Sequence, residues 1–495
     1  MKHVYLGVDL GTSAVKCLAM DIHGNRLSHG EGRYPLYAPK PGWVEQNPEE
    51  WIEPVYSAIR DCLKGLNNCK PIALSFSGHM SSLLVLDKDM KPLLPCSLVG
   101  DMRAANQANE LNAKLCETFV EMTGNVPWQA FIAPKLLWIK QERPDVYEQI
   151  EKFVLAKDYI RYRMTDELCT DYTDAGNSLL FNPLKKDWDD LLITGSGLDK
   201  RIFPELKAPT EFAGSINSYT SQVTGLPEGL PVICGAADMA CSQLGTGGLN
   251  PERLIITLST SGQICMNVKQ PSPMAKEKVT FHPGIDSMYA MASVFSGGLA
   301  VNWAYCLLSG QNPGDVPDFN SLGVLAKNIE NFCPGKSGIT FLPFLTGSGS
   351  PHNKSTDKAH FIGMTLASDR KDIMHAVMEG VAYNFRENAD VFRALGNWSE
   401  VRLGGGGTKI KAWRHIIADV LGENIDILRT SDASAMGACM LAIAGVGHAD
   451  SIIELSENFA ICDDRIEYNH KNKHEYDELY EKYCYIYNSL EHSMQ

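Results

Sequence analysis

The sequence lacks several patterns that would place it in familiar classes of protein. None of its 14 cysteines forms a CxxC pair, so neither a zinc site nor a disulfide framework is indicated. Cys17, Cys234 and Cys265 lie within apolar runs, where a reduced thiol behaves as a small hydrophobic group. No uninterrupted apolar run approaches the roughly 20 residues that span a bilayer. These absences argue against zinc-binding, disulfide-rich and membrane-spanning proteins.

Positive charge is also scarce. The chain has 45 basic and 59 acidic residues and a formal net charge of −14, which repels nucleic acid and anionic membranes unless a local basic patch overrides it. The sequence has no such patch. An apolar run begins by residue 4, which leaves no room for a signal peptide. We therefore expect a cytoplasmic protein with no nucleic-acid partner and no membrane partner.

The length of the chain predicts two domains. A chain of 495 residues is too long for one ordinary hydrophobic core. A glycine-rich stretch from Gly245 to Pro251 lies near the midpoint and is typical of a linker. We place the N-terminal domain at residues 1–247 and the C-terminal domain at residues 248–495.

Near the N-terminus, an apolar run from Val4 to Asp9 meets a turn of small residues, and a second apolar run returns after it. This pattern predicts an antiparallel β-hairpin with a polar tip. The N–H groups and hydroxyls of such a tip can hold phosphate oxygens, and a carboxylate at the strand end could hold a hydrated Mg²⁺. The residues concerned are Asp9, Gly11, Thr12, Ser13 and Lys16. The alternative is an ordinary hairpin turn, which short glycine motifs often are.

The same pattern occurs again about half a chain length later. An apolar run from Leu254 to Leu258 leads into Ser259, Thr260 and Ser261, and a second strand-like run follows from Gln263 to Val268. Two hairpins of this kind indicate a duplicated architecture with a phosphate clamp between the halves.

A candidate ligand site follows the short strand predicted at Pro71 to Phe76. This strand ends in a cluster of polar residues that contains His79, Met80 and Ser81. Open α/β sheets bind ligands at the ends of their strands, so this cluster is a candidate site for a small polar ligand. A single histidine, however, is more often a structural residue than a catalytic one.

Three charged residues are expected at the starts of helices. Asp101 and Arg103 offer one acceptor and one donor before a long helix, or they could cap that helix and form a surface ion pair. Asp238 follows the strand predicted at Leu230 to Cys234 and lies in the first turn of a helix of small residues. The helix dipole favours its ionised form, which could accept a proton. On local grounds, a role as a simple helix cap is equally good.

The C-terminal half contains a run of four glycines between a predicted strand and a predicted helix. Gly405, Gly406 and Gly407, with Lys409 after them, would allow a flat ligand to lie against bare backbone. The run is not a Walker A loop because no Gly-Lys-Ser/Thr closes it, and a plain tight turn is the alternative. A second helix of small residues is predicted at Ala433 to Gly445, and the acidic, tyrosine-rich segment from His474 onward predicts a terminal surface helix.

Taken together, these segments resemble the FGGY family of ATP-dependent carbohydrate kinases over nearly the whole chain, and most closely its xylulokinase-like branch. Ala359 to Met364 and Asp372 to Glu379 fit the C-terminal signature of the family, and Lys135 to Glu142 fits the N-terminal signature. Ala130 and Ile132 depart from that N-terminal signature. The resemblance implies the α/β, ribonuclease H-like fold of the sugar kinase/actin/Hsp70 superfamily, with two domains around an interdomain cleft.

The resemblance also implies a role for each polar segment. Asp238 would be the general base, and Asp9 would be catalytic by holding Mg²⁺ through water. The sugar would contact His79, Met80, Ser81, Asp101, Arg103 and Asp238. ATP would contact Gly11, Thr12, Ser13, Lys16, Ser259, Thr260, Ser261, Gly405, Gly406, Gly407 and Lys409.

The sugar side departs from the xylulokinase pattern. Met80 and Ser81 occupy a Met-His step, Val99 and Gly100 replace a Trp-Asn pair, and Met239 replaces the polar residue that usually follows the catalytic aspartate. These departures leave the identity of the sugar open, although they do not affect phosphoryl transfer.

Two functional hypotheses follow. The favoured one is an enzyme that uses ATP and Mg²⁺ to phosphorylate a ketopentose such as xylulose, or a related ketose or polyol, at a terminal hydroxyl. The competing one is an actin-like ATPase that couples hydrolysis to conformational change without a sugar. Sugar and ATP are the expected partners, and a homodimer is one candidate assembly.

Overall fold

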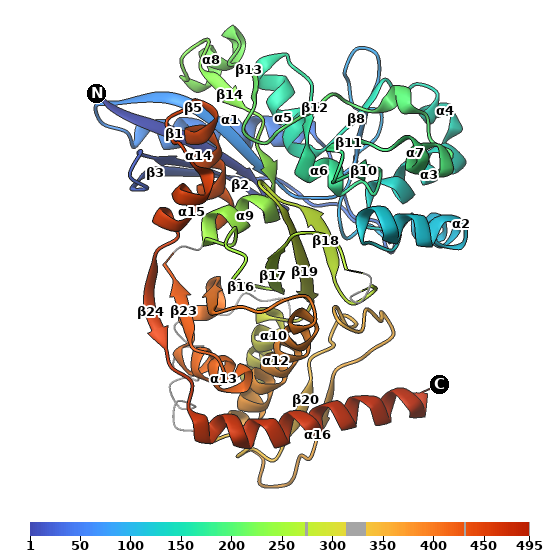
Figure 1. Ribbon diagram of the computed structural model, residues 1–495, viewed down its shortest axis with the longest axis vertical. Coiled ribbons are helices and arrows are strands. Elements are labelled where there is room, and N and C mark those ends of the chain that lie inside the picture. The colour runs from blue at the N-terminus through green and yellow to red at the C-terminus, as the bar shows by residue number, and fades with distance from the viewer. Residues whose placement is uncertain (273–275, 313–332, 430–431, 495) are drawn as a thin grey trace.

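The computed structural model describes residues 1–272, 276–312, 333–429 and 432–494 and shows two lobes, each built on a seven-stranded sheet (Figure 1). The upper lobe in Figure 1 contains the sheet from the first half of the chain. Its strands are β13 (Phe212–Ser215), β14 (Pro231–Ile233), β5 (Cys69–Gly78), β1 (Lys2–Leu10), β2 (Ala14–Met20) and β3 (Arg26–Arg33), in that order, with β15 (Ala236–Ala237) also paired to β5.

The sheet of the lower lobe repeats this arrangement. Its strands are, in order, β18 (Thr280–Pro283), β19 (Met288–Val294), β17 (Gly262–Val268), β16 (Arg253–Leu258), β22 (Glu400–Gly404), β23 (Ile425–Leu428) and β24 (Cys462–Ile466). In both sheets the first strand pairs antiparallel with its hairpin partner and parallel with the strand on its other side. The predicted duplication and both predicted hairpins are therefore confirmed.

Burial explains why the central strands are almost continuously apolar. In β1 the side chains from Val4 to Val8 are all buried, as expected for a strand covered by helices on both faces. On one face α1 (Glu49–Lys64) packs against β2 and β3, and on the other α14 (Ala433–Gly445) packs against β1 and β5. In the lower lobe α12 (Arg370–Arg393) packs against β17 and β19.

The helix α14 comes from the second half of the sequence but packs in the upper lobe. It belongs to the second half of the chain, yet Figure 1 shows it among the strands of the upper lobe. There it packs against α9 (Asp238–Thr246). A Cβ atom on Gly437 would lie 2.1 Å from the carbonyl oxygen of Cys241, so only glycine permits this approach. The small residues of these two helices thus allow their backbones to approach closely.

The remaining helices surround the two sheets. In the upper lobe they are α2 (Ala105–Thr123), α3 (Ile132–Glu142), α4 (Pro144–Tyr147), α5 (Ala156–Thr165), α6 (Tyr172–Gly176), α7 (Asp190–Gly195) and α8 (Ser218–Thr224). Those in or beside the lower lobe are α10 (Gly298–Ser309), α13 (Lys411–Leu421), α15 (Ile452–Phe459) and α16 (His470–Met494). Across the described ranges, none of these helices is both long enough and apolar enough to cross a bilayer.

The prediction that the terminal helix lies on the surface is wrong for one of its faces. In α16 the side chains of Tyr476, Tyr483 and Tyr487 are buried in the core of the lower lobe. The Tyr483 hydroxyl donates to the Glu387 carboxylate on α12 at 3.1 Å. Because these tyrosines recur at helical spacing, they form an apolar face that packs against α12 and α13.

Candidate active site

The carboxyl ends of three neighbouring strands bring the two candidate catalytic aspartates together. Asp9 on β1 is opposite Ser77 on β5, and Ser77 is in turn opposite Ala236 on β15. Asp238 follows β15 directly, so the two carboxyl groups flank the end of β5. The Ser77 hydroxyl donates to Asp9 Oδ1 at 2.7 Å. This is the edge of an α/β sheet at which ligands bind.

The carboxyl group of Asp238 has a pKa near neutral pH. Burial, together with the nearby Asp9, raises its pKa to about 7, although backbone hydrogen bonds from Met239 and Met80 partly oppose the shift. Asp238 Oδ1 accepts the Met239 N–H at 2.8 Å. The N-cap of α9 is Ala237, not Asp238. Asp238 is therefore the first residue inside the helix and not its N-cap, so the alternative of a simple helix cap is wrong.

Asp9 and Lys16 belong to a chain of charged groups that reaches the other half of the sequence. Burial raises the pKa of Asp9, and Lys16 and the Ser77 hydrogen bond partly offset that rise. Lys16 Nζ lies 2.8 Å from Asp432 Oδ1, just before α14. The positive charge of Lys16, which the sequence predicts to bind phosphate, is thus already paired with an acidic residue. Asp432 was missed in the sequence because nothing local connects it to a lysine 416 positions away.

The tip of the first hairpin is accessible and anchored from below. Thr12 and Ser13 are exposed. The Gln46 side-chain amide donates to the Thr12 carbonyl oxygen at 2.7 Å, and the Tyr34 hydroxyl donates to the Gly11 carbonyl. With the carbonyls held by these two side chains, the hydroxyls of the tip remain available to a ligand.

The tip of the second hairpin is held in a similar way. The Ser259 N–H and hydroxyl both donate to the Ser261 carbonyl, at 2.9 and 2.8 Å. At the start of α10, the N–H groups of Gly298 and Leu299 donate to the Ser259 and Thr260 carbonyls at 2.7 and 2.9 Å. Thr260 itself is exposed at the tip.

The glycine-rich turn lies directly beside this second tip. Gly405 has φ of +93°, and a Cβ atom there would lie 2.5 Å from the carbonyl oxygen of Leu258, the residue before Ser259. A Cβ atom on Gly406 would meet no atom within 4 Å. Gly405 is therefore required by packing, whereas Gly406 faces open space where a flat ligand could lie. Lys409 is exposed after the turn.

Three of the residues predicted for the sugar are consecutive in the chain, and the middle one, Met80, lies next to Asp238. Met80 contacts the Asp238 carboxylate through its backbone. His79 is buried against the Trp51 ring, and burial lowers its pKa to about 4. Within the described ranges, no group hydrogen-bonds the buried His79 Nε2. Ser81 has φ of +60°, and its carbonyl accepts a hydrogen bond from the buried Lys135 at 2.7 Å.

Asp101 and Arg103 form a buried ion pair, so the predicted surface ion pair is wrong. Arg103 donates from Nε to Asp101 Oδ1 at 2.8 Å and from Nη2 to Asp101 Oδ2 at 2.6 Å. Its guanidinium also contacts Glu45 at 2.6 Å and lies over the Trp43 ring at 3.6 Å. The N-cap of α2 is Ala104, so neither residue is the cap of that helix. The pair joins the segment before α2 to the segment around Glu45.

Comparisons with known proteins identify the family of this chain. Residues 4–245 match the N-terminal domain of the FGGY family of carbohydrate kinases, and residues 254–446 match its C-terminal domain. The xylulose kinase of Bacillus subtilis (strain 168) is 32% identical, and the match covers 93% of this chain and 91% of that protein. The chain belongs to the FGGY family of carbohydrate kinases.

Two solved structures share the fold over nearly the whole chain. A ligand-bound xylulose kinase and a gluconate kinase, both from Lactobacillus acidophilus, each have a TM-score of 0.90 and 26% identity, and each match covers 99% of this chain and 98% of the other. The protein is accordingly a carbohydrate kinase, an enzyme of ATP-dependent sugar phosphorylation. The competing hypothesis, an actin-like ATPase without a sugar substrate, is not favoured.

Proposed function

We propose that the enzyme phosphorylates a terminal hydroxyl of a ketopentose or a related ketose or polyol, with Asp238 as general base. The observation that carries this proposal is the position of Asp238, at the ligand-binding edge of the sheet, with a pKa raised to about 7 by burial and Asp9. A general base works best when its pKa lies near the working pH. The carboxylate can orient the attacking hydroxyl and accept its proton as the new phosphate ester bond forms.

Asp9 fits the role of holding Mg²⁺ through water. Carboxylate oxygens are the ligands that this ion prefers, and the closeness of Asp9 and Asp238, which raises the pKa of Asp238, is the situation a nearby cation relieves. When bound, Mg²⁺ neutralises charge on the transferred phosphoryl group. The two hairpin tips, with exposed Thr12 and Thr260, would hold the phosphate oxygens of ATP.

The adenosine moiety would lie against Gly406, where the backbone faces open space. We also propose that the domains meet between residues 247 and 248. Gly247 ends α9 in the left-handed region with φ of +77°, a conformation that suits a glycine at the end of a helix. A homodimer stays a prediction.

Two features bear on the identity of the sugar. The buried His79 Nε2 has no hydrogen-bond partner among the described residues, and such an atom is costly unless a ligand or water satisfies it. Ser81 occupies the histidine position of the Met-His step, and Met239 replaces the polar residue that usually follows the catalytic aspartate. A pocket of this kind should select a sugar with fewer or differently placed hydroxyls than D-xylulose, because each buried polar group left unpaired costs about 1–3 kcal/mol.

A substrate panel tests this proposal. ADP release would be measured with ATP and Mg²⁺ in the presence of single pentuloses, hexuloses, polyols and gluconate, and the phosphorylated product of each active sugar identified by mass spectrometry. We expect one sugar other than D-xylulose to raise turnover sharply. Turnover that is greatest by far with D-xylulose would contradict the inference about the pocket. ADP release that no sugar stimulates would contradict the kinase proposal and favour the ATPase.

A further inference from the structure

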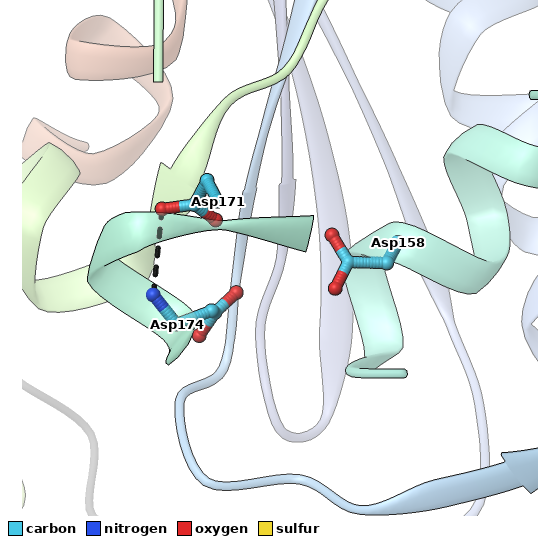
Figure 2. Close-up of side chains that lie close together, drawn as sticks. All are labelled: Asp158, Asp171 and Asp174. Carbon is cyan, nitrogen blue, oxygen red and sulfur yellow. Dashed lines mark hydrogen bonds between the residues drawn. The ribbon is translucent and has the colours of Figure 1, made fainter. Parts of the chain in front are cut away.

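Behind the strand that leads to Asp238, the upper lobe contains a buried cluster of charged groups. Asp158 on α5 and Asp171 and Asp174 around α6 point their carboxyl groups toward one another (Figure 2). Such a group could hold a metal ion, but the ammonium of Lys157 occupies its centre, at 2.6, 2.6 and 2.9 Å from the three carboxyl groups. The cluster is therefore an ionic network with an internal cation.

The cluster contains a second cation besides Lys157. Arg161 adds a second cation, 3.1 Å from Asp158. Burial raises the pKa of Asp174 well above its usual range, whereas for Asp158 the nearby Lys157 and Arg161 outweigh burial and lower the pKa. Two cations therefore lie among the three carboxyl groups. Buried ionic networks contribute little to stability compared with apolar packing, so stability alone is a weak reason for this network.

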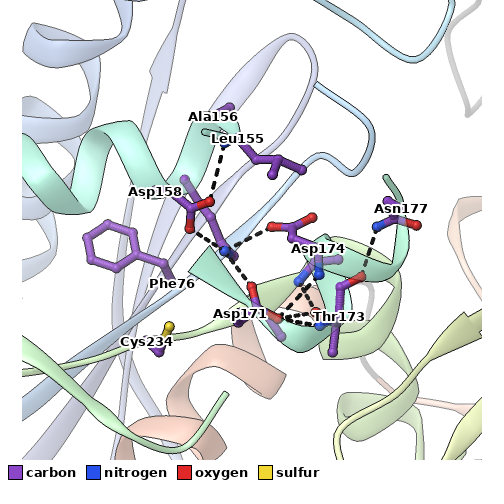
Figure 3. Close-up of polar contacts among 12 residues, drawn as sticks. Phe76, Leu155, Ala156, Asp158, Asp171, Thr173, Asp174, Asn177 and Cys234 are labelled. Atoms are coloured by element: carbon purple, nitrogen blue, oxygen red, sulfur yellow. Dashed lines mark hydrogen bonds and ion pairs between the residues drawn. The ribbon is translucent and has the colours of Figure 1, made fainter. Parts of the chain in front are cut away.

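A chain of hydrogen bonds connects the cluster to β15, the strand that directly precedes Asp238. Asp171 is paired with Lys157 through Oδ2. The Oδ1 atom of Asp171 accepts the Thr173 hydroxyl (Figure 3). The Thr173 hydroxyl oxygen in turn accepts the N–H of Ala237 at 2.8 Å. Ala237 immediately precedes Asp238. The chain from Lys157 to this N–H is therefore continuous, and every member of it is buried.

The strand held by this chain is short and has few backbone partners. β15 consists of two residues, and its only strand neighbour in the described sheet is β5, at Ser77 and Gly78. Lys157 also packs on this end of β5, because a Cβ atom on Gly78 would lie 2.7 Å from the Lys157 Cβ. The cluster thus supports both strands whose ends carry the site.

We propose that Thr173, held by Asp171 and Lys157, is a positioning residue that fixes the backbone before Asp238 and thereby aligns its carboxylate with the sugar hydroxyl. This inference rests on the proposed role of Asp238 as general base. Phosphoryl transfer depends mainly on alignment, and small displacements of a catalytic group can lower the rate by about 10²-fold. Thr173 itself touches neither substrate nor nucleotide in this scheme.

Thr173→Val tests the proposal, because valine keeps the shape of the side chain and removes the hydroxyl. We expect kcat to fall tenfold or more, with KM for sugar and for ATP changed less than threefold. Thr173→Ser, which keeps the hydroxyl, should restore most of the kcat. Should the valine variant fail to fold, Thr173→Ala is measured by the same criteria, because alanine removes the hydroxyl without adding a methyl group in its place.

Thr224→Val is the matched control. The buried Thr224 hydroxyl on α8 donates to the Thr220 carbonyl at 2.6 Å and accepts the Leu226 N–H at 3.2 Å. Like Thr173→Val, the variant therefore loses one donated and one accepted hydrogen bond, but at a site away from β15. It should lower the melting temperature and leave kcat unchanged. Equal kcat values for Thr173→Val and Thr224→Val would overturn the proposal, as would a loss at Thr173 that serine does not restore.

The outcome for Asp238→Asn separates this inference from the proposed function. If that variant is inactive while Thr173→Val is as active as wild type, only the positioning role is wrong. If Asp238→Asn keeps most of its turnover, the proposed base is wrong, and the positioning role is then overturned with it.

Discussion

Replacement of Asp238 by asparagine should remove activity and, at neutral to alkaline pH, increase stability. Asparagine keeps the size of the side chain and can still accept the Met239 N–H, which Asp238 accepts at 2.8 Å. It cannot accept a proton. General-base assistance is worth about 10² to 10⁴ in rate, so we expect kcat to fall by that factor, whereas an asparagine in a merely capping position would serve almost as well as aspartate.

The effect on stability follows from the pKa. In the folded protein the carboxyl pKa rises from 3.8 to about 7, and at 1.36 kcal/mol per pKa unit this corresponds to roughly 4 kcal/mol. This rise in pKa destabilises the folded state at neutral and alkaline pH. Between pH 3.8 and about 7 the unfolded chain releases this proton and the folded chain keeps it, so stability is lost as the pH rises, and the loss is complete above pH 7. The amide carries no such cost.

The assay combines turnover with thermal unfolding in the absence of ATP, Mg²⁺ and sugar. We expect Asp238→Asn to melt at a higher temperature than wild type at pH 8, and the difference to shrink steadily toward pH 5. Ser434→Ala, which removes a hydrogen bond to the backbone carbonyl of Asp238 at 3.2 Å, is a control that leaves the carboxyl in place. A variant that retains most of its turnover, or a difference in melting temperature that does not depend on pH, would refute the reasoning.

Two further predictions concern glycines. Gly406→Ala should weaken ATP binding in a nucleotide titration without changing the melting temperature, because its Cβ meets no atom within 4 Å, whereas Gly405→Ala should lower the melting temperature because of its φ of +93° and a contact of 2.5 Å with the Leu258 carbonyl. Unchanged ATP affinity in Gly406→Ala would remove adenosine from this turn. Gly437→Ala should destabilise the contact between α9 and α14, since its Cβ would lie 2.1 Å from the Cys241 carbonyl, and a melting temperature equal to that of wild type would contradict this packing argument.

The sequence by itself determined the repeated strand pattern and the places where chemistry could occur. Both hairpins, the helices of small residues and the glycine-rich turn follow from the spacing of apolar and small residues, which is a local property of the chain. The end of the strand at Asp9 could be identified in the same way, and so could β14, whereas the two-residue β15 directly before Asp238 was not predicted. Tyr476, Tyr483 and Tyr487 were a helical stripe that the sequence also contained, and this spacing could have predicted that one face of α16 is buried.

The tertiary structure alone decided which of these segments meet. The ion pair of Lys16 with Asp432 joins residues 416 positions apart, and the Lys157 cluster gathers carboxylates from two separate helical segments. No periodic pattern encodes such pairings, because they depend on how strands and helices stack after the chain has folded. The pKa of Asp238 is of the same kind, since burial and the charge of Asp9 set it, and both exist only when the ends of β1, β5 and β15 lie side by side.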